Sequence, residues 1–289
     1  MYEVYFLVVE VGVFHRYRGV TAALTTKHDK EKVLGPALAR IGISIQVIPF
    51  DTDQFGTFSG EITRSAGQRE TALEKARTGL SATGLLYGIA SEGSVGPDPI
   101  IPFINSNLEA IAWVDNDLGF ELVEIHQSTD IVAIQEKVRP KDSLENILKK
   151  ADFPNHALIV RPEKFPGSVF KGIRTLTELE AAIVKVASEN QGQAIVESDL
   201  RAHMSPSRMK NISAAAEQLA RRLETICKEC KCPGFGVVEF LKGAECELCG
   251  EFIQEVVIGK KYGCVKCEYT EEEIEKRTIT AANCSRCNP

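Results

Sequence analysis

Eight of the nine cysteines form four Cys-x-x-Cys pairs near the C-terminal end, and no cysteine precedes them. Two thiolates on one such pair supply half of a tetrahedral zinc site, so four pairs supply ligands for two ions. A disulfide-stabilised secreted protein would be small and rich in cysteine throughout, whereas here a long cysteine-free region comes first. The pattern predicts two structural Zn²⁺ sites. Their ligands are Cys227, Cys230, Cys246, Cys249, Cys264, Cys267, Cys284 and Cys287.

The spacing leaves open which pairs share an ion. The intervening lengths are 15, 14 and 16 residues, which suit a zinc ribbon in which consecutive pairs combine. Residues 235–241 and 252–258 each read as one strand between pairs, which favours an interleaved pairing instead. An iron–sulfur cluster is the alternative centre, because four cysteines also satisfy one. The ninth cysteine, Cys232, is either a bystander thiol or an alternate ligand.

A second group of residues that could bind a ligand follows an apolar run at 85–90, which reads as a buried strand. Residues 91–96 are small apart from one carboxylate and one valine, so we expect a loop in which glycines leave room for a ligand. Such loops bind ligands at the carboxyl ends of strands in open α/β sheets. The alternative is a connecting turn with a solvated carboxylate. The candidate residues are Ser91, Glu92, Gly93 and Ser94.

An earlier strand, at 20–25, leads through a polar loop into a helix that we expect Asp29 to cap and to run to about Arg40. Backbone N–H groups and the helix dipole at such a junction favour phosphate. Lys27, His28 and Lys30 would add cationic or polar donors. An ordinary strand–helix connection is the alternative.

Three further carboxylates are candidates for a Mg²⁺ site with substrate phosphates. Asp51 and Asp53 follow an apolar strand at 43–50 and share a face if the chain is locally extended. Glu70 lies on a helix expected over Gln68–Thr83. The alternative for the two aspartates is turn chemistry, in which such residues are common, and the alternative for the glutamate is a solvated helix face.

Two arginines and a histidine surround a second strand-to-helix turn, which follows a strand at 194–197. Ser205 has the character of an N-cap with Pro206 as the first helical residue. The planar fork of arginine suits phosphate or carboxylate, although ion pairs with Glu197 or Asp199 would use the same side chains. The residues concerned are Arg201, His203 and Arg208.

Strands that alternate with helices indicate an α/β fold. We expect residues 1–226 to form a three-layer mixed sheet with flanking helices and a ligand cleft. Residues 227–289 then form a small zinc-ribbon-like domain.

The net charge is −6, and neither part carries a basic surplus, so nucleic acid is a poor partner. Each Zn(Cys)₄ centre adds formal charge −2, which favours a structural role or a protein partner for the cysteine-rich region. Residues 5–14 are apolar but short and contain Glu10, so no membrane span is expected. No cationic residue precedes them, which argues against a signal peptide. We expect a cytoplasmic protein.

The chain resembles an uncharacterised bacterial family, known only as a domain of unknown function with a cysteine-rich C-terminus. The likeness covers nearly the whole chain from about Val20. The segments that carry it, besides the cysteine pairs, are residues 26–32, 50–60, 90–97 and 197–203.

A fainter resemblance is to the inosine/xanthosine triphosphatase-like pyrophosphatases. Residues 26–31, 70–77 and 88–93 correspond to that superfamily's first loop, acidic helix and acidic strand end. The asparagine usual in its first loop is absent, and Lys27 or His28 stands near that place. This resemblance implies a Mg²⁺-dependent hydrolase of a nucleotide or another phosphorylated small molecule. The alternative from the residues alone is a non-enzymatic zinc-ribbon binding or adaptor protein.

Overall fold

The computed structural model describes residues 15–49 and 67–288, and these fold into three β-sheets with five α-helices. The strands are β1 (Thr21–Thr26), β2 (Ser44–Pro49), β3 (Tyr87–Pro97), β4 (Asn105–Asp115), β5 (Phe120–Ser128), β6 (Gln135–Val138), β7 (Leu158–Arg161), β8 (Phe170–Ile173), β9 (Ala194–Ser198), β10 (Gly236–Cys246), β11 (Phe252–Gly263), β12 (Thr270–Ile274) and β13 (Thr278–Ile279). The helices are α1 (Glu31–Ala39), α2 (Gln68–Thr83), α3 (Glu145–Lys150), α4 (Leu176–Glu189) and α5 (Pro206–Glu224), with short 3₁₀ turns η2 (Ala202–Met204) and η3 (Ala281–Asn283). The predicted mixed α/β class is confirmed.

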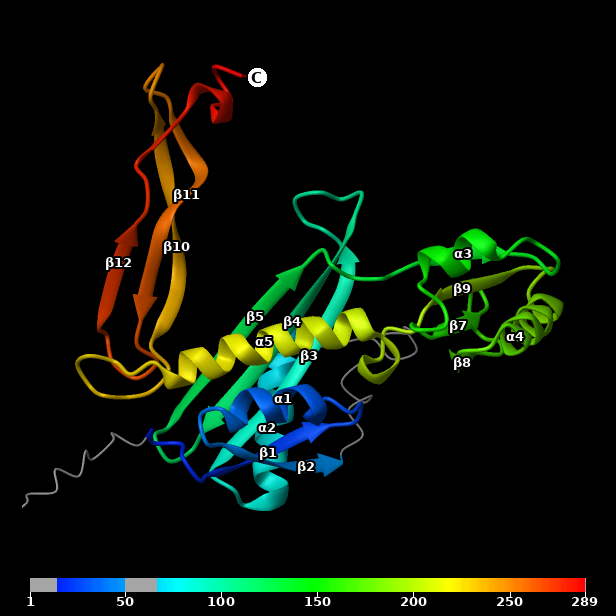
Figure 1. Ribbon diagram of the computed structural model, residues 1–289, viewed down its shortest axis with the longest axis horizontal. Coiled ribbons are helices and arrows are strands. Elements are labelled where there is room, and N and C mark those ends of the chain that lie inside the picture. The colour runs from blue at the N-terminus through cyan, green and yellow to red at the C-terminus, as the bar shows by residue number, and fades with distance from the viewer. Residues whose placement is uncertain (1–14, 50–66, 289) are drawn as a thin grey trace, which may run out of the picture.

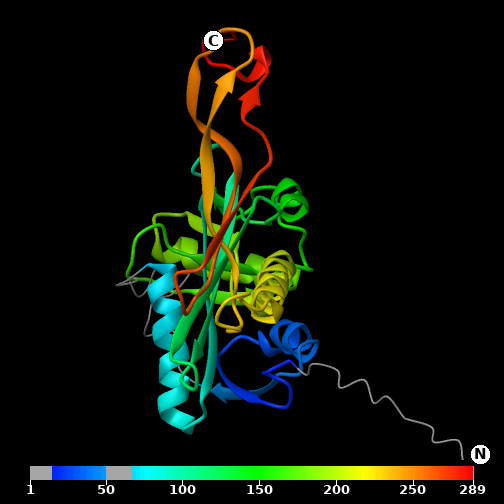
Figure 2. The same ribbon diagram turned by 90° about the vertical axis from the view of Figure 1, so that its left-hand side faces the viewer.

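The first sheet has the strand order β2-β1-β3-β4-β5. Strand β1 is parallel to β2 and β3, whereas β3, β4 and β5 form an antiparallel meander. Alternation along the strands sends Ile89 and Trp113 to one core and Ala90 and Ala112 to another. Helices α1 and α5 cover the first face and α2 covers the second, which gives three layers (Figure 2).

Two predicted helices are confirmed closely by the structure. Helix α2 has the predicted bounds, and α5 begins with Pro206 after Ser205, whose hydroxyl accepts from the Arg208 N–H. The predicted N-cap of α1 is wrong. Asp29 has a left-handed backbone (φ 55°), and Lys30 occupies the N-cap position without a side-chain cap bond. The helix therefore begins one residue later than an Asp29 cap would give.

The predicted loop at residues 91–96 is also wrong, because β3 continues to Pro97. Each of these residues pairs with β4, and Gly93 lies opposite Glu109. Small residues suit this stretch for a reason other than a turn. A Cβ atom at Gly93 would lie 2.4 Å from a Glu109 carboxylate oxygen and 2.6 Å from the Arg208 guanidinium. The glycine leaves space for two large charged side chains.

A second sheet, of order β6-β9-β7-β8, forms a lobe with α3 and α4 to one side of the first (Figure 1). Its strands pair antiparallel, and its own apolar core includes Leu158, Val196 and Leu179. The chain returns from this lobe through η2 into α5. The turn at 199–205 therefore joins the lobe to the first sheet.

The third sheet, β12-β11-β10-β13, is a long arm that projects from the first sheet and carries the C-terminus at its far end (Figure 1). Its small buried core consists of Ala244, Cys246, Ile279 and Cys284. None of the helices in residues 15–49 and 67–288 is long and apolar enough to cross a membrane.

We predict that Gly88→Ala destabilises the protein, whereas Gly96→Ala in the same strand does not. A Cβ atom at Gly88 would lie 2.8 Å from the Ala76 carbonyl oxygen on α2, while nothing lies within 4 Å of the corresponding position at Gly96. Because α2 must shift to relieve the first clash, we expect a loss of about 1–3 kcal/mol in the free energy of unfolding by urea. Equal stabilities would contradict the close packing of α2 on β3.

Candidate functional site

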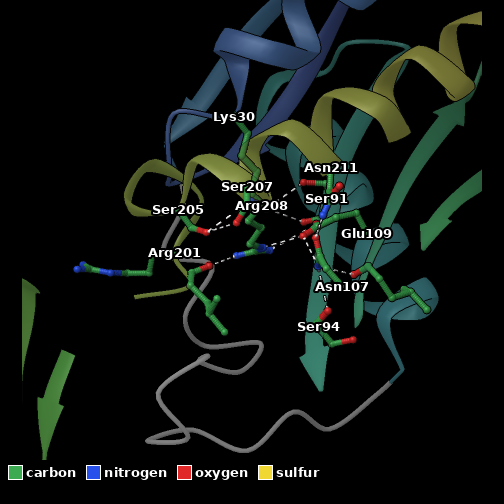
Figure 3. A network of polar contacts seen from close by, with 12 residues as sticks. Lys30, Ser91, Ser94, Asn107, Glu109, Arg201, Ser205, Ser207, Arg208 and Asn211 are labelled. Carbon is green, nitrogen blue, oxygen red and sulfur yellow. Dashed lines mark hydrogen bonds and ion pairs between the residues drawn. The ribbon is translucent and has the colours of Figure 1, made fainter. Parts of the chain in front are cut away.

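Most of the predicted ligand-binding residues lie at the carboxyl end of β1 (Figure 3). The register pairs Thr25 with Ala90 and ends there, while β3 runs on to Pro97. The loop after β1, the far half of β3 and the first turn of α5 therefore meet where β1 stops. This is the part of an open α/β sheet at which ligands usually bind.

Lys30 is buried at this point between α1 and the sheet, with 8% of its surface exposed. Its ammonium group donates to the Ser91 hydroxyl at 2.9 Å and to the Ser91 carbonyl oxygen at 3.2 Å. Burial, reinforced by the charge of Arg208, lowers the pKa of Lys30 to about 8. Among the described residues no carboxylate pairs with this ammonium group.

Arg208 on α5 forms an ion pair with Glu109 on β4 in the same layer. Its Nε donates to Glu109 Oε1 at 2.7 Å, and both side chains are almost fully buried. Asn107 also donates to Glu109 at 3.0 Å, and Asn211 donates to Asn107 at 3.0 Å. Arg208 further donates to the Leu200 carbonyl oxygen at 2.6 Å. This network joins the sheet, α5 and the turn that leads from the second lobe.

Glu92 lies on the opposite face of the sheet from Ser91, because the two are neighbours in a continuous strand. It pairs with Lys75 on α2 at 2.5 Å, and both side chains are buried. Ser94 shares this face and accepts from Gln68 at 2.8 Å. The residues predicted to line one loop are therefore divided between the two faces of β3.

Arg201 and His203 lie on the turn before α5, at the edge of the network. Arg201 pairs with the fully buried Asp199 at 2.5 Å and points away from the cluster (Figure 3), so the predicted ion-pair alternative is confirmed. His203 stacks on His28 with ring centroids 4.9 Å apart. Burial, together with the charge of Arg201, lowers the pKa of His203 and favours its neutral form.

Three polar atoms near this site are buried and have no hydrogen-bond partner in the described structure. They are the hydroxyl oxygens of Thr25 and Thr26 and the Nδ1 atom of His203. Thr25 faces α2 at Gly79, whereas Thr26 follows it on the other face of β1. An unpaired buried hydroxyl costs free energy that a ligand or an ordered water would recover.

The remaining candidates contribute no side chain to the network described above. Glu70 and Lys27 are exposed, the first on the first turn of α2 and the second in the loop after β1. Asp51 and Asp53 lie outside the described residues. Gly93 contributes space and no side chain, as its approach to Glu109 and Arg208 shows.

The sequence analysis missed Glu109 and Asn107 as members of the site and gave Lys75 no role in it. The sequence pattern of β4 could have identified Glu109. Glu109 is a carboxylate in an otherwise apolar buried stretch, and its period-2 neighbours Ile111 and Trp113 belong to the core. A charge in such a position must be paired, which predicts a cationic partner on the covering helix.

The eight predicted metal ligands form two groups of four, and within each group the sulfur atoms all lie within 4.8 Å of one another. One group contains Cys227, Cys230, Cys264 and Cys267, and the other contains Cys246, Cys249, Cys284 and Cys287. Sγ–Sγ distances of 3.5 and 3.8 Å occur in the first group, and of 3.8 and 3.9 Å in the second. A tetrahedral ion with metal–sulfur bonds of about 2.3 Å requires sulfur separations of roughly 3.8 Å. Both groups fit one four-coordinate ion.

The pairing is thus interleaved: first with third, and second with fourth. The hairpin explains this, because β10 and β11 carry the chain from one end of the arm to the other and back. The first group lies at the base of the arm, where Cys264 packs on the core of the first sheet and Lys266 donates to the Leu118 carbonyl oxygen. Cys232 is buried in that core and belongs to neither group, so it is a bystander.

The sequence matches the profile of a domain of unknown function (DUF6671) over residues 75–289. The chain therefore belongs to this family. The match begins within α2 and includes β3, the second lobe, α5 and the cysteine-rich arm. No curated protein sequence matches the chain.

We predict that Lys30→Met stabilises the protein at pH 7. The folded pKa of about 8 lies below the usual lysine value of 10.5, so the folded state disfavours the charged form. Below pH 8 this penalty is complete, and the substitution should gain up to about 3 kcal/mol in the free energy of unfolding. Between pH 8 and the unfolded pKa the folded protein loses the proton first, so the gain should shrink.

Urea titrations at several pH values measure this difference. Lys32→Met is the matched control, because Lys32 lies in the same helix but is exposed and pairs with Asp29. A gain for Lys30→Met that did not depend on pH would contradict a buried, strained ammonium group.

We predict that the two metal groups can be removed separately. The double variant Cys227→Ser/Cys264→Ser should lose one metal ion per chain, because both residues belong to one group. Cys227→Ser/Cys246→Ser should lose both ions, and Cys232→Ser should lose none. Elemental analysis of the purified variants gives these counts. Sequential pairing would exchange the results of the two double variants.

Proposed function

We propose that this member of the DUF6671 family binds a phosphorylated small molecule at the carboxyl end of β1 and hydrolyses it with Mg²⁺. The observation that carries the proposal is the buried ammonium group of Lys30. Its described bonds go only to the neutral oxygens of Ser91. The nearby carboxylates of Glu92 and Glu109 each pair with another cation.

A buried charge without a counter-charge is costly, and functional sites are where such costs persist. An anionic ligand would supply the missing charge and raise the pKa of Lys30 back toward its usual value. The Ser91 hydroxyl lies 2.9 Å from it and can donate to a phosphate oxygen, as can the buried Thr26 hydroxyl at the end of β1, which has no hydrogen-bond partner among the described residues. These features support an oxyanion as the ligand.

Glu92 is the predicted metal-binding carboxylate that lies beside this site in the described residues. Mg²⁺ is commonly held by one or two carboxylates together with substrate phosphates, so Glu92 would exchange Lys75 for the ion. Glu70, Asp51 and Asp53 remain candidates for a second carboxylate from the sequence. A bound Mg²⁺ would polarise the phosphoryl group and lower the pKa of a bound water. Lys30 would hold the phosphate in place.

A second role, binding of a protein partner, is favoured for the metal-binding arm. Large apolar side chains are exposed along it, including Val238, Phe240 and Phe252. We assign zinc to both cysteine groups, because closed tetrathiolate sites are typical of structural zinc. Free thiolate ligands also suit a reducing compartment, which supports a cytoplasmic location.

The test is a panel of phosphorylated compounds incubated with the zinc-loaded protein and Mg²⁺ or Mn²⁺. The panel contains inorganic pyrophosphate, phosphate monoesters, and canonical and deaminated nucleoside triphosphates. We expect release of phosphate or pyrophosphate from at least one class. Lys30→Met and Glu92→Gln should each reduce the rate by a factor of about 100 or more, because each removes a charge that the transition state needs.

The control is Glu180→Gln, which alters an exposed carboxylate on α4 and should leave the rate unchanged. Zinc content must remain the same in every variant. Turnover that persists in Lys30→Met, or no turnover and no phosphate-dependent rise in Tm at millimolar concentrations, would contradict the proposal.

A further inference from the structure

A groove of about 1080 Å³ lies between the outer strand of the first sheet and the arm. One wall is formed by β5 and the C-terminal part of α5, and the other by β10, β11 and β12 (Figure 1). It is separate from the network at Lys30, which lies at the other end of α5. The groove is large enough for a short peptide, and the chemistry of its lining indicates which kind of peptide would bind.

The backbone of β5 is unpaired along this groove. Strand β5 is the last of the order β2-β1-β3-β4-β5, and among the described strands it pairs with β4 alone. It is nine residues long, from Phe120 to Ser128. An edge strand of this length presents N–H and C=O groups that a further extended chain can pair with.

Apolar side chains project into the groove from both walls. Ile125 on β5 is 48% exposed, and Val238 and Phe240 on β10 are 52% and 55% exposed. Gln218 on α5 also lines the groove, and its side-chain oxygen is buried without a hydrogen-bond partner among the residues that the structure describes. Alternate side chains of a strand paired with β5 would cover the apolar residues of the arm.

The charges that line the groove favour a basic occupant. Three arginines and five glutamates line it. Arg222 already pairs with Glu124, Glu121 with Arg77, and Glu271 with Lys228, so the acidic surplus in the lining rests on Glu272 and Glu273 of the arm. There Glu271, Glu272 and Glu273 are consecutive in β12. Acidic residues beside an apolar surface complement a segment that alternates apolar and basic residues.

We propose that this groove binds an extended, basic polypeptide segment of another protein, which adds to the edge of β5 as a sixth strand. The inference specifies the partner for the role of the arm given under Proposed function, and it does not depend on the ligand at Lys30. Main-chain hydrogen bonds to β5 would supply general affinity. The apolar residues and the glutamates of the arm would select the sequence.

The probe is a fluorescein-labelled nine-residue peptide, Lys-Val-Thr-Val-Lys-Val-Thr-Val-Lys, titrated against the zinc-loaded full chain by fluorescence anisotropy. Two control peptides replace the lysines by glutamates or alternate residues by prolines, which cannot pair. Phe240→Ser and Ile125→Lys alter the two walls of the groove. Val184→Ser is the matched control, because Val184 is equally exposed (56%) but lies on α4 in the second lobe.

We expect the basic peptide to bind, with affinity reduced roughly tenfold by Phe240→Ser or Ile125→Lys and unchanged by Val184→Ser. Neither control peptide should bind comparably. Hydrogen exchange should show new protection of β5 amides at 120–128. Lys30→Met should bind the peptide normally, which separates this proposal from the phosphate site.

Four results would overturn the inference. The first is no binding at millimolar peptide, and the second is equal binding by wild type and both groove variants. The third is binding without protection of 120–128, which would show attraction to the acidic arm alone. Concentration-dependent dimerisation that Phe240→Ser abolishes would also overturn it, since the occupant would then be a second copy.

Discussion

The ion pair between Arg208 and Glu109 is the interaction on which the arrangement of the site depends. It is almost fully buried, so removal of either partner would leave an uncompensated charge that costs about 3–5 kcal/mol. Because Arg208 is in the first turn of α5 and Glu109 is in β4, the pair fixes the start of the helix over the sheet. The bond from Arg208 to the Leu200 carbonyl oxygen extends this constraint to the turn from the second lobe.

The same pair explains why sequence reasoning failed in β3. Glycine and serine are typical turn residues, so residues 91–96 read as a loop. In the structure the stretch is a strand that pairs with β4. Gly93 is small because it lies opposite Glu109 and must leave room for the side chains of Glu109 and Arg208, and not because the chain turns there. Helices α2 and α5 were predictable, since their apolar periodicity and the Ser205–Pro206 start are local signals. The pairing of Glu109 with Arg208 was not predictable from local signals, because the two residues lie 99 positions apart in the chain.

The cysteine spacing shows a similar limit. The spacing predicts eight ligands and two sites. It does not determine which Cys-x-x-Cys pairs share a site, because the pairing depends on the length and direction of β10 and β11. The long hairpin separates consecutive pairs and brings alternate pairs together at its two ends. The arm has a small core of its own, with only four buried residues in its cluster. Metal bonds at both ends would stabilise a sheet that is so extended and has so small a core.

The position at which β1 ends determines whether one ligand can contact residues on both faces of β3. Ser91 with Lys30 and Glu92 with Lys75 lie on opposite sides of the same strand. A ligand cannot pass through the sheet, but the pairing of β1 with β3 stops at Ala90. From Ser91 onward, in the described residues, only β4 pairs with β3. The phosphorylated molecule that we propose, bound at this edge, could contact Lys30 on one side while a metal ion held by Glu92 contacts it from the other. The early end of β1 is thus what makes a shared site geometrically feasible.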